Sequence, residues 1–365
     1  MKTIIFLMLF LLILLLAGCE KALLKEEFGN TPPGNFNAFW LEFDRAYGAM
    51  QPKNLNWDSL KVVYGNTLNE NTDDKTLFDA LSGLLNEIND GHADLLAPGI
   101  GFYRSWNRRD KSFFQDFVTQ DLKTVGEQQA VIRQEYLNNQ FKSTTVDGWY
   151  FFYGSIEKQN KTIGYLYIPT FNLNNYPDAF IQSAIDDFQN FDAVIIDLRF
   201  NGGGTTEAFV KTLNKFASKP ELFLKSKYRN GPGHGDFSEM LEHHIRPQTN
   251  CLNNKPVAIL MNSFTASSSE HFILGMKTQE GVFTVGDTTC GAFSSVNERL
   301  MPNGWKFRLG GQIVFTSEGN LMVDDKGNYL EGIGLAPDCY VPDQWIPLKS
   351  GLDMPLEKAL DELTK

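Results

Sequence analysis

The segment Ala193–Arg199 is the feature that most restricts how this chain can fold. It opens with an uninterrupted apolar stretch, which is typical of a strand buried on both faces of a parallel sheet. The glycine-rich turn Phe200–Gly204 follows, and the helical spacing of Ala208, Phe209 and Leu213 begins directly after it. A buried strand, a tight turn and a helix in this order predict an α/β fold.

A second segment repeats this order, with serines in the turn. The apolar run Pro256–Met261 is followed by Thr265–Glu270 and then by the helical pattern His271–Lys277. A strand that turns abruptly into a helix exposes a serine hydroxyl beside the unpaired N–H groups of the helix start, a favourable place for a nucleophile. Serine and threonine are also favoured there as helix caps, so the turn alone leaves both roles open.

The glycines Gly202–Gly204 would allow backbone N–H groups to approach a ligand closely. No Lys-Ser or Lys-Thr pair follows them, so a phosphate-binding loop is not favoured. Close packing of the helix on the strand is the structural alternative. Together, a glycine-rich turn and a serine turn are what an acyl-transfer site needs, an oxyanion hole and a nucleophile.

Three segments, taken in chain order, resemble the signature blocks of the S41 serine peptidases: Asp197–Gly204, Thr265–Glu270 and Leu330–Asp338. This family includes the C-terminal processing peptidases and the tricorn core peptidase. The resemblance implies a crotonase-like (ClpP-like) α/β core of ββα units. It also implies that Ser267 is the nucleophile and that the N–H groups of Gly203 and Ser268 form the oxyanion hole.

The chain departs from the processing peptidases at the position of their catalytic lysine. Those enzymes use a Ser/Lys dyad, whereas Ala292 occupies the corresponding place here. Lys277 lies about ten residues after Ser267, roughly 15 Å along the helix axis, which is too far for a hydrogen bond. We therefore expect a different base.

His92 is the expected base, because Asp90–His92 resembles the Asp-Gly-His element of the tricorn-like branch. The apolar spacing of Leu77–Ile88 predicts a helix that ends at Asp90-Gly91, with the glycine as its stop. An ordinary imidazole titrates near pH 6.5, which suits a general base. In the same branch a glutamate at the position of Glu331 belongs to the site and would orient His92, with Asp94 as the fallback partner.

The other histidines are weaker candidates. We expect His271 to be a packing or surface residue, because its side chain points away from a hydroxyl at the helix start. His234 is expected at a loop tip, and the adjacent His243 and His244 point apart on a helix. A zinc site formed by His234, His243 and an acid has no supporting motif, so no metal and no organic cofactor are expected.

The N-terminal 18 residues resemble a lipoprotein signal peptide that ends at Cys19. A transmembrane anchor is the alternative, but the apolar run is short for a bilayer span. Lipidation of Cys19 would tether the chain to a membrane through a leash at 19–34, which predicts a membrane-anchored lipoprotein of the bacterial cell envelope.

Three further cysteines allow at most one internal disulfide, for which Cys251 and Cys339 are the suggested pair. Cys290 falls in the segment that carries the lysine in the dyad branch and is expected near the site. The net charge of −11 provides no basic surface and argues against nucleic-acid binding.

Beyond the leader, four regions are expected. Residues 35–94 form a helical N-terminal unit, and 95–160 form a mixed insert or cap without a clear PDZ module. Residues 161–348 form the catalytic core, and 349–365 form a C-terminal helix.

The predicted function is a lipid-anchored serine peptidase that hydrolyses peptides or unfolded polypeptides through Ser267, His92 and Glu331. A catalytically inactive protein that binds peptides or small ligands on the same fold is the alternative. A structural lipoprotein would explain the leader but none of the three blocks.

Overall fold

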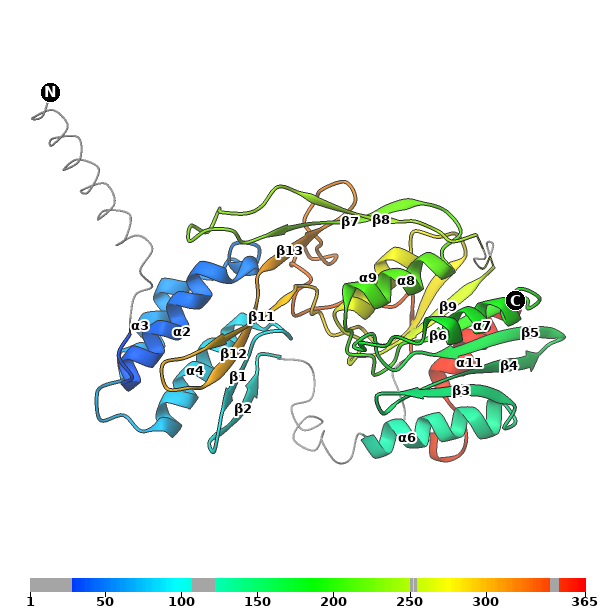
Figure 1. The fold of residues 1–365 in the computed structure, drawn as a ribbon, viewed down its shortest axis with the longest axis horizontal. Coiled ribbons are helices and arrows are strands. Elements are labelled where there is room, and N and C mark those ends of the chain that lie inside the picture. Colours follow the sequence, from blue (N-terminus) through cyan, green and yellow to red (C-terminus); the bar gives the residue numbers. More distant parts are fainter. Residues whose placement is uncertain (1–27, 107–121, 250–251, 253–254, 342–347) are drawn as a thin grey trace, which may run out of the picture.

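The computed structural model describes residues 28–106, 122–249, 252, 255–341 and 348–365. The signal peptide, Cys19 and Cys251 lie outside the described residues, as does most of the leash. Within the described part of the chain, no helix has both the length and the apolar character needed to cross a bilayer. The strands form sheets of seven, four and three strands (Figure 1).

The seven-stranded sheet is built around the two apolar runs noted in the sequence, which form its central strands β6 and β9, both buried along their whole length. Pairing is parallel from β14 to β5 and antiparallel from β5 to β3. The strands lie in the order β14 (Cys339–Tyr340), β10 (Val282–Gly286), β9 (Val257–Met261), β6 (Ala193–Asp197), β5 (Lys161–Tyr167), β4 (Trp149–Lys158) and β3 (Phe141–Val146).

Helices cover both faces of this sheet, so the predicted α/β fold is confirmed (Figure 1). Val194 and Ile196 of β6 contribute to the apolar core beneath α7 (Asp178–Phe188), α8 (Thr206–Phe216) and α9 (Ser268–Met276). Ile195, which points to the opposite face, packs in the second core with α11 (Met354–Thr364). On that same side lie α6 (Leu122–Val131) and the π-helical turn Ile132–Tyr136.

The four-stranded sheet joins the N-terminal helices to a distant part of the sequence. Its order is β11 (Val296–Leu300), β12 (Lys306–Gly310), β1 (Asp94–Ala97) and β2 (Gly101–Arg104), all antiparallel. One face packs against α2 (Pro32–Ala46), the 3₁₀ turn Gly48–Met50, α3 (Trp57–Gly65) and α4 (Asp74–Ile88). Aromatic contacts such as Phe39 with Phe307, at 4.8 Å between ring centres, hold these layers together.

The third sheet, β13 (Gln312–Phe315), β7 (Glu221–Tyr228) and β8 (Leu241–Ile245), extends between the two ends of the molecule (Figure 1). Residues 95–160, expected to form a mixed insert or cap, supply β2 and most of β1 to one sheet and β3 and β4 to another. Each pair of strands also joins a partner outside this range, and local sequence patterns do not reveal such pairings.

Candidate active site

Ser267 stands at the junction between β9 and α9, directly before the first helical residue. Its φ of 58° and ψ of −122° form a combination that a residue with a side chain adopts only under constraint. The Ser267 N–H donates to Glu270 Oε2 at 2.9 Å, and the Ala266 N–H donates to the Asn201 carbonyl at 3.0 Å. The turn is therefore a strained strand-to-helix elbow that presents a half-buried serine.

Gly203 lies directly against this elbow. A Cβ built on it would come within 2.7 Å of Ser267 Cβ and 2.9 Å of Ser268 N, and its φ is 92°, so only glycine fits without strain. Ser268 begins α9, so its N–H lies outside the reach of intrahelical acceptors. The two predicted oxyanion donors are thus neighbours, although the Gly203 N–H also donates to Asn201 Oδ1 at 2.9 Å.

The Ser268 side chain has a separate task, because its hydroxyl donates to the Gly204 carbonyl at 2.7 Å. This bond ties the start of α9 to the glycine turn that follows β6. The predicted oxyanion role therefore concerns only the backbone N–H of Ser268.

Glu270 holds the elbow to the loop that would carry the dyad lysine. Besides the Ser267 N–H, its buried carboxylate accepts the N–H groups of Gly291 at 2.7 Å and Ala292 at 2.9 Å, and the Thr289 hydroxyl at 2.5 Å. Burial raises the pKa of Glu270, while these four donors lower it. Sequence reasoning assigned no role to Glu270, although an acid three residues after an N-terminal serine is a capping-box pattern.

His92 follows α4, which ends at Asn89 in the left-handed conformation with φ 47°. The His92 N–H donates to Asp90 Oδ1 at 2.7 Å, and within the described residues its buried Nδ1 makes no hydrogen bond. Removal from water, together with the nearby charges of Arg308 and Arg104, lowers the pKa of His92 to about 4. The imidazole is consequently neutral at pH 7 and able to accept a proton.

The structure brings His92 together with Glu331 and with Asp90, which the sequence had noted only as part of the motif. One nitrogen of His92 and one carboxylate oxygen from each acid lie within 4.8 Å of one another. Burial and the neighbouring charge of Asp90 raise the pKa of Glu331 well above its ordinary value. These three groups are also a donor set that could ligate a divalent cation.

Lys53, from the N-terminal helical unit, ties the two loops of this cluster together. Its Nζ donates to the carbonyl oxygens of Asn89 at 2.9 Å and Glu331 at 2.6 Å. Asn89 Nδ2 also donates to the Gly332 carbonyl at 3.2 Å. Sequence reasoning missed Lys53, because its partners are backbone atoms far away in the chain.

The loop at Ala292 links the serine elbow to the histidine cluster. Directly after the two residues that bond Glu270, the N–H groups of Phe293 and Ser294 both donate to the Glu331 carboxylate at 3.1 Å. Ala292 itself is 1% exposed, and a Cβ on Gly91 would lie 3.1 Å from its methyl group. The position that holds lysine in the dyad branch therefore faces the loop that carries His92.

His271 packs between aromatic rings, with ring centres 5.8 Å from Phe209 and 6.3 Å from Phe293, in keeping with the packing role expected for it. Burial lowers its pKa to about 4. The remaining histidines pair outside the cluster: His234 with Asp44 at 2.7 Å, His243 with Ser226 at 2.8 Å and His244 with Glu242 at 3.2 Å.

The predicted neighbourhood of Cys290 agrees with the structure, since a Cβ on Gly91 would lie 2.9 Å from its Sγ. Cys339 is a free thiol, and Cys251, the partner suggested for it, lies outside the described residues.

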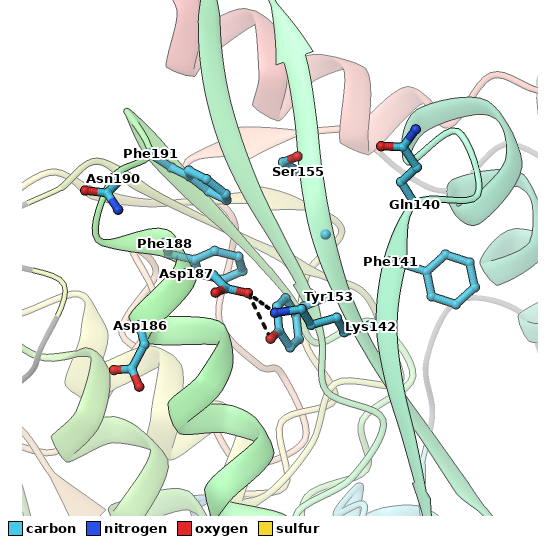
Figure 2. A pocket seen from close by; sticks show the side chains of 11 residues that line it. Gln140, Phe141, Lys142, Tyr153, Ser155, Asp186, Asp187, Phe188, Asn190 and Phe191 are labelled. Atoms are coloured by element: carbon cyan, nitrogen blue, oxygen red, sulfur yellow. Dashed lines mark hydrogen bonds and ion pairs between the residues drawn. The ribbon is translucent and has the colours of Figure 1, made fainter.

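A hollow of about 460 Å³ lies between the β3–β4 hairpin and the end of α7 (Figure 2). Within it, Asp187 accepts hydrogen bonds from Lys142 at 2.7 Å and from the Tyr153 hydroxyl at 3.0 Å. No residue of the predicted site lines this hollow. The candidate active site is instead the region of the Ser267 elbow and the His92 loop, which the segment at Ala292 links.

An elbow serine beside backbone donors, on an α/β fold, is the arrangement of serine acyl hydrolases, the class that includes the serine peptidases. The model of peptidase family S41 matches residues 162–341. This region of the chain therefore belongs to peptidase family S41, as the sequence blocks predicted.

Two curated relatives are C-terminal processing proteases of Bacillus subtilis (strain 168). CtpA is 27% identical over 137 residues, which cover 37% of this chain and 27% of CtpA. CtpB is 24% identical over 162 residues, which cover 44% of this chain and 32% of CtpB. The matched stretch thus spans no more than a third of either relative.

A solved structure from Parabacteroides merdae ATCC 43184, described as that of a candidate peptidase, is also similar. It is 23% identical with a TM-score of 0.75, and the alignment covers 92% of this chain and 98% of that one. At this identity the likeness shows a shared fold.

Proposed function

We propose that this protein is a serine peptidase in which Ser267 is the nucleophile, His92 the general base and Glu331 the group that orients His92. The observation that carries the proposal is the strained backbone of Ser267, held against Gly203. A strained serine is retained where its exposure serves chemistry. The proposal assigns the chain to the histidine-containing, tricorn-like branch of the family.

In this mechanism neutral His92 accepts the proton of Ser267 Oγ as that oxygen attacks the scissile carbonyl carbon. The N–H groups of Gly203 and Ser268 stabilise the oxyanion, with Gly203 sharing its hydrogen between the oxyanion and Asn201. His92 then donates the proton to the leaving amine. A water molecule, deprotonated by the same imidazole, releases the acyl group from Ser267.

The carboxyl groups around His92 offset the low basicity that burial imposes on it. Once His92 is protonated, its positive charge stabilises an ionised Glu331 within the same cluster. Asp94, the fallback partner, is a poorer candidate because Arg308 Nε donates to its carboxylate at 2.9 Å. Glu331 therefore remains the orienting group in the proposal.

The substrate would be a peptide or an unfolded polypeptide. The names of the two Bacillus relatives support this class, since both act as carboxy-terminal processing proteases. The crotonase-like description of the core belongs to this proposal too. So does lipidation of Cys19, which would hold the enzyme on a membrane of the bacterial cell envelope.

Hydrolysis of a flexible fluorogenic peptide tests the proposal. We expect turnover by the parent protein, its loss in Ser267→Ala, and its retention in Ser269→Ala, because the buried Ser269 does not occupy the elbow position. Turnover that survives Ser267→Ala would refute the nucleophile. Peptide binding without turnover by folded parent protein would favour the inactive binding protein.

A further inference from the structure

The four-stranded sheet has one face packed against the N-terminal helices and one open face that begins beside the candidate site. Along β1, Leu95 and Ala97 are buried in the core, whereas Leu96, between them, is 43% exposed. Asp94 points to the same side as Leu96, by the alternation of a strand. His92 precedes Asp94 by two residues, and the charge of Asp94 acts on the His92 pKa.

The first two rows of this face together carry one more cation than acids, with Arg104, Arg308 and Lys306 against Asp94 and Glu298. Asp94 pairs across the sheet with Arg104 on one side and Arg308 on the other. Arg308 donates hydrogen bonds to the Asp94 carboxylate, with its Nε 2.9 and 3.0 Å from the two oxygens. Arg104 reaches that carboxylate only at 3.7 Å, and its side chain is 41% exposed. Its planar guanidinium retains donors suited to a second carboxylate.

The second row is apolar. Leu96 pairs with Phe102 on β2 and with Lys306 on β12, and Lys306 pairs with Leu300 on β11. Phe102 is 55% exposed and Leu300 is 68% exposed. Lys306 turns its charge to Glu298, at 3.0 Å, so its stem lies between the apolar side chains. Exposed apolar side chains gathered in this way indicate a binding surface.

We propose that this face binds the substrate chain, an inference that rests on the proposed peptidase function. Arg104 binds a carboxylate of the substrate, and Phe102 with Leu96 binds a large apolar side chain one row farther from the scissile bond. The two rows are two residues apart along β1, about 7 Å, which is also the spacing of side chains on one side of an extended peptide. The preferred substrate is therefore an extended polypeptide with an acidic residue and, two positions farther from the cleaved bond, an apolar residue.

Two observations favour a substrate over other occupants. The face is continuous with the segment that carries the proposed base, so a chain held at Ser267 can extend across it. The protein has a net charge of −11, but the first two rows of this face carry one more cation than acids, and Arg104 is the cation farthest from a carboxylate, which suits an anionic group.

Matched fluorogenic peptides test the proposal. The two peptides of the first pair carry Glu or Gln at a site two positions from the cleaved bond. The two peptides of the second pair carry Leu or Ser at a site two positions farther from that bond. Both pairs are made twice, once with these sites before the bond and once with them after it. On one side, the parent protein should prefer Glu and Leu by about tenfold in kcat/KM. Arg104→Gln should bring the Glu/Gln ratio to about one, mainly through KM, and Phe102→Ser should do the same to the Leu/Ser ratio.

The control variant is Arg299→Gln, on β11 of the same sheet, which removes an ion pair with Glu42 of α2 at 3.1 Å and should leave both ratios unchanged. If the parent protein cleaves the peptides but Arg104→Gln keeps its Glu preference, the proposal is wrong. Dimerisation that is lost in Phe102→Ser, with an unchanged Leu/Ser ratio, would assign the face to a second copy and overturn it.

Binding to Ser267→Ala separates this proposal from the proposed catalysis. Fluorescence anisotropy with the same labelled peptides should show tighter binding of the Glu peptide, and Arg104→Gln in that background should remove the difference. If the Glu peptide binds more tightly and Arg104→Gln removes the difference, while the parent protein cleaves no peptide, the proposed substrate-binding face is supported and the proposed peptidase function is refuted. Equal binding of the Glu and Gln peptides would refute the substrate-binding face.

Discussion

Replacing Gly203 with alanine removes the space that the serine elbow needs. The new Cβ would lie 2.7 Å from Ser267 Cβ and from the Ala266 carbonyl oxygen, where ordinary contacts begin at 3.4 Å. The φ of 92° adds a cost of about 1–2 kcal/mol for a residue with a side chain. The turn must shift by several tenths of an ångström, which carries the Gly203 N–H away from the oxyanion. Loss of one such donor lowers kcat by about 10²–10³-fold, so we expect a fall of at least about 100-fold.

Steady-state hydrolysis of a fluorogenic peptide measures this effect, and thermal unfolding confirms that the variant folds. Gly202→Ala is the matched control, because no atom lies within 4 Å of its new Cβ and its φ is not positive. The control should keep kcat within about twofold, as exposed substitutions usually do. A folded Gly203→Ala protein with the parent kcat would refute the role given to the glycine turn.

Three further predictions follow from the histidine cluster. The folded-state pKa of His92 is about 4, below its ordinary 6.5, so kcat/KM should stay level as the pH is lowered to near 4. The free energy of unfolding should fall as the pH drops from 6.5 to 4, because the unfolded state then binds more protons at this residue. Profiles of kcat/KM against pH and urea unfolding measure the two effects, and an activity midpoint near pH 6.5 would contradict the burial argument. Ala292→Lys should lower kcat/KM, because its side chain would crowd Gly91 at a buried position, and a gain would instead indicate a lysine-based site. Lys53→Met should reduce kcat about tenfold and shift the profile of kcat against pH, because the substitution releases the Glu331 loop and removes the charge that lowers the Glu331 pKa. An unchanged kcat and an unchanged pH profile in folded protein would contradict the role given to Lys53.

The local part of this structure was predictable from the sequence. Both strand–turn–helix units follow from apolar runs beside short polar or glycine turns, which depend on neighbouring residues alone. The glycine at 203 could be recognised as a close approach, and the structure provides the reason in its contact with Ser267. The nucleophile among three serines came from the family resemblance, because periodicity does not distinguish them.

The non-local part was not predictable. The pairing of β1 with β12 joins residues about two hundred positions apart, and no local pattern encodes such a register. The links made by Lys53 and Glu270 are also non-local, since they use backbone atoms of loops elsewhere in the chain. The low pKa of His92 depends on burial, which a sequence motif does not reveal.

Labelling with a serine-reactive fluorophosphonate tests the central claim most directly, because it reports the activated hydroxyl without requiring the correct substrate. Peptide mapping by mass spectrometry should place the tag on Ser267 at neutral pH. His92→Ala should slow labelling by about 10²-fold or more, since the base is removed. A tag on Ser269, or an untagged Ser267 in folded protein, would contradict the proposed site.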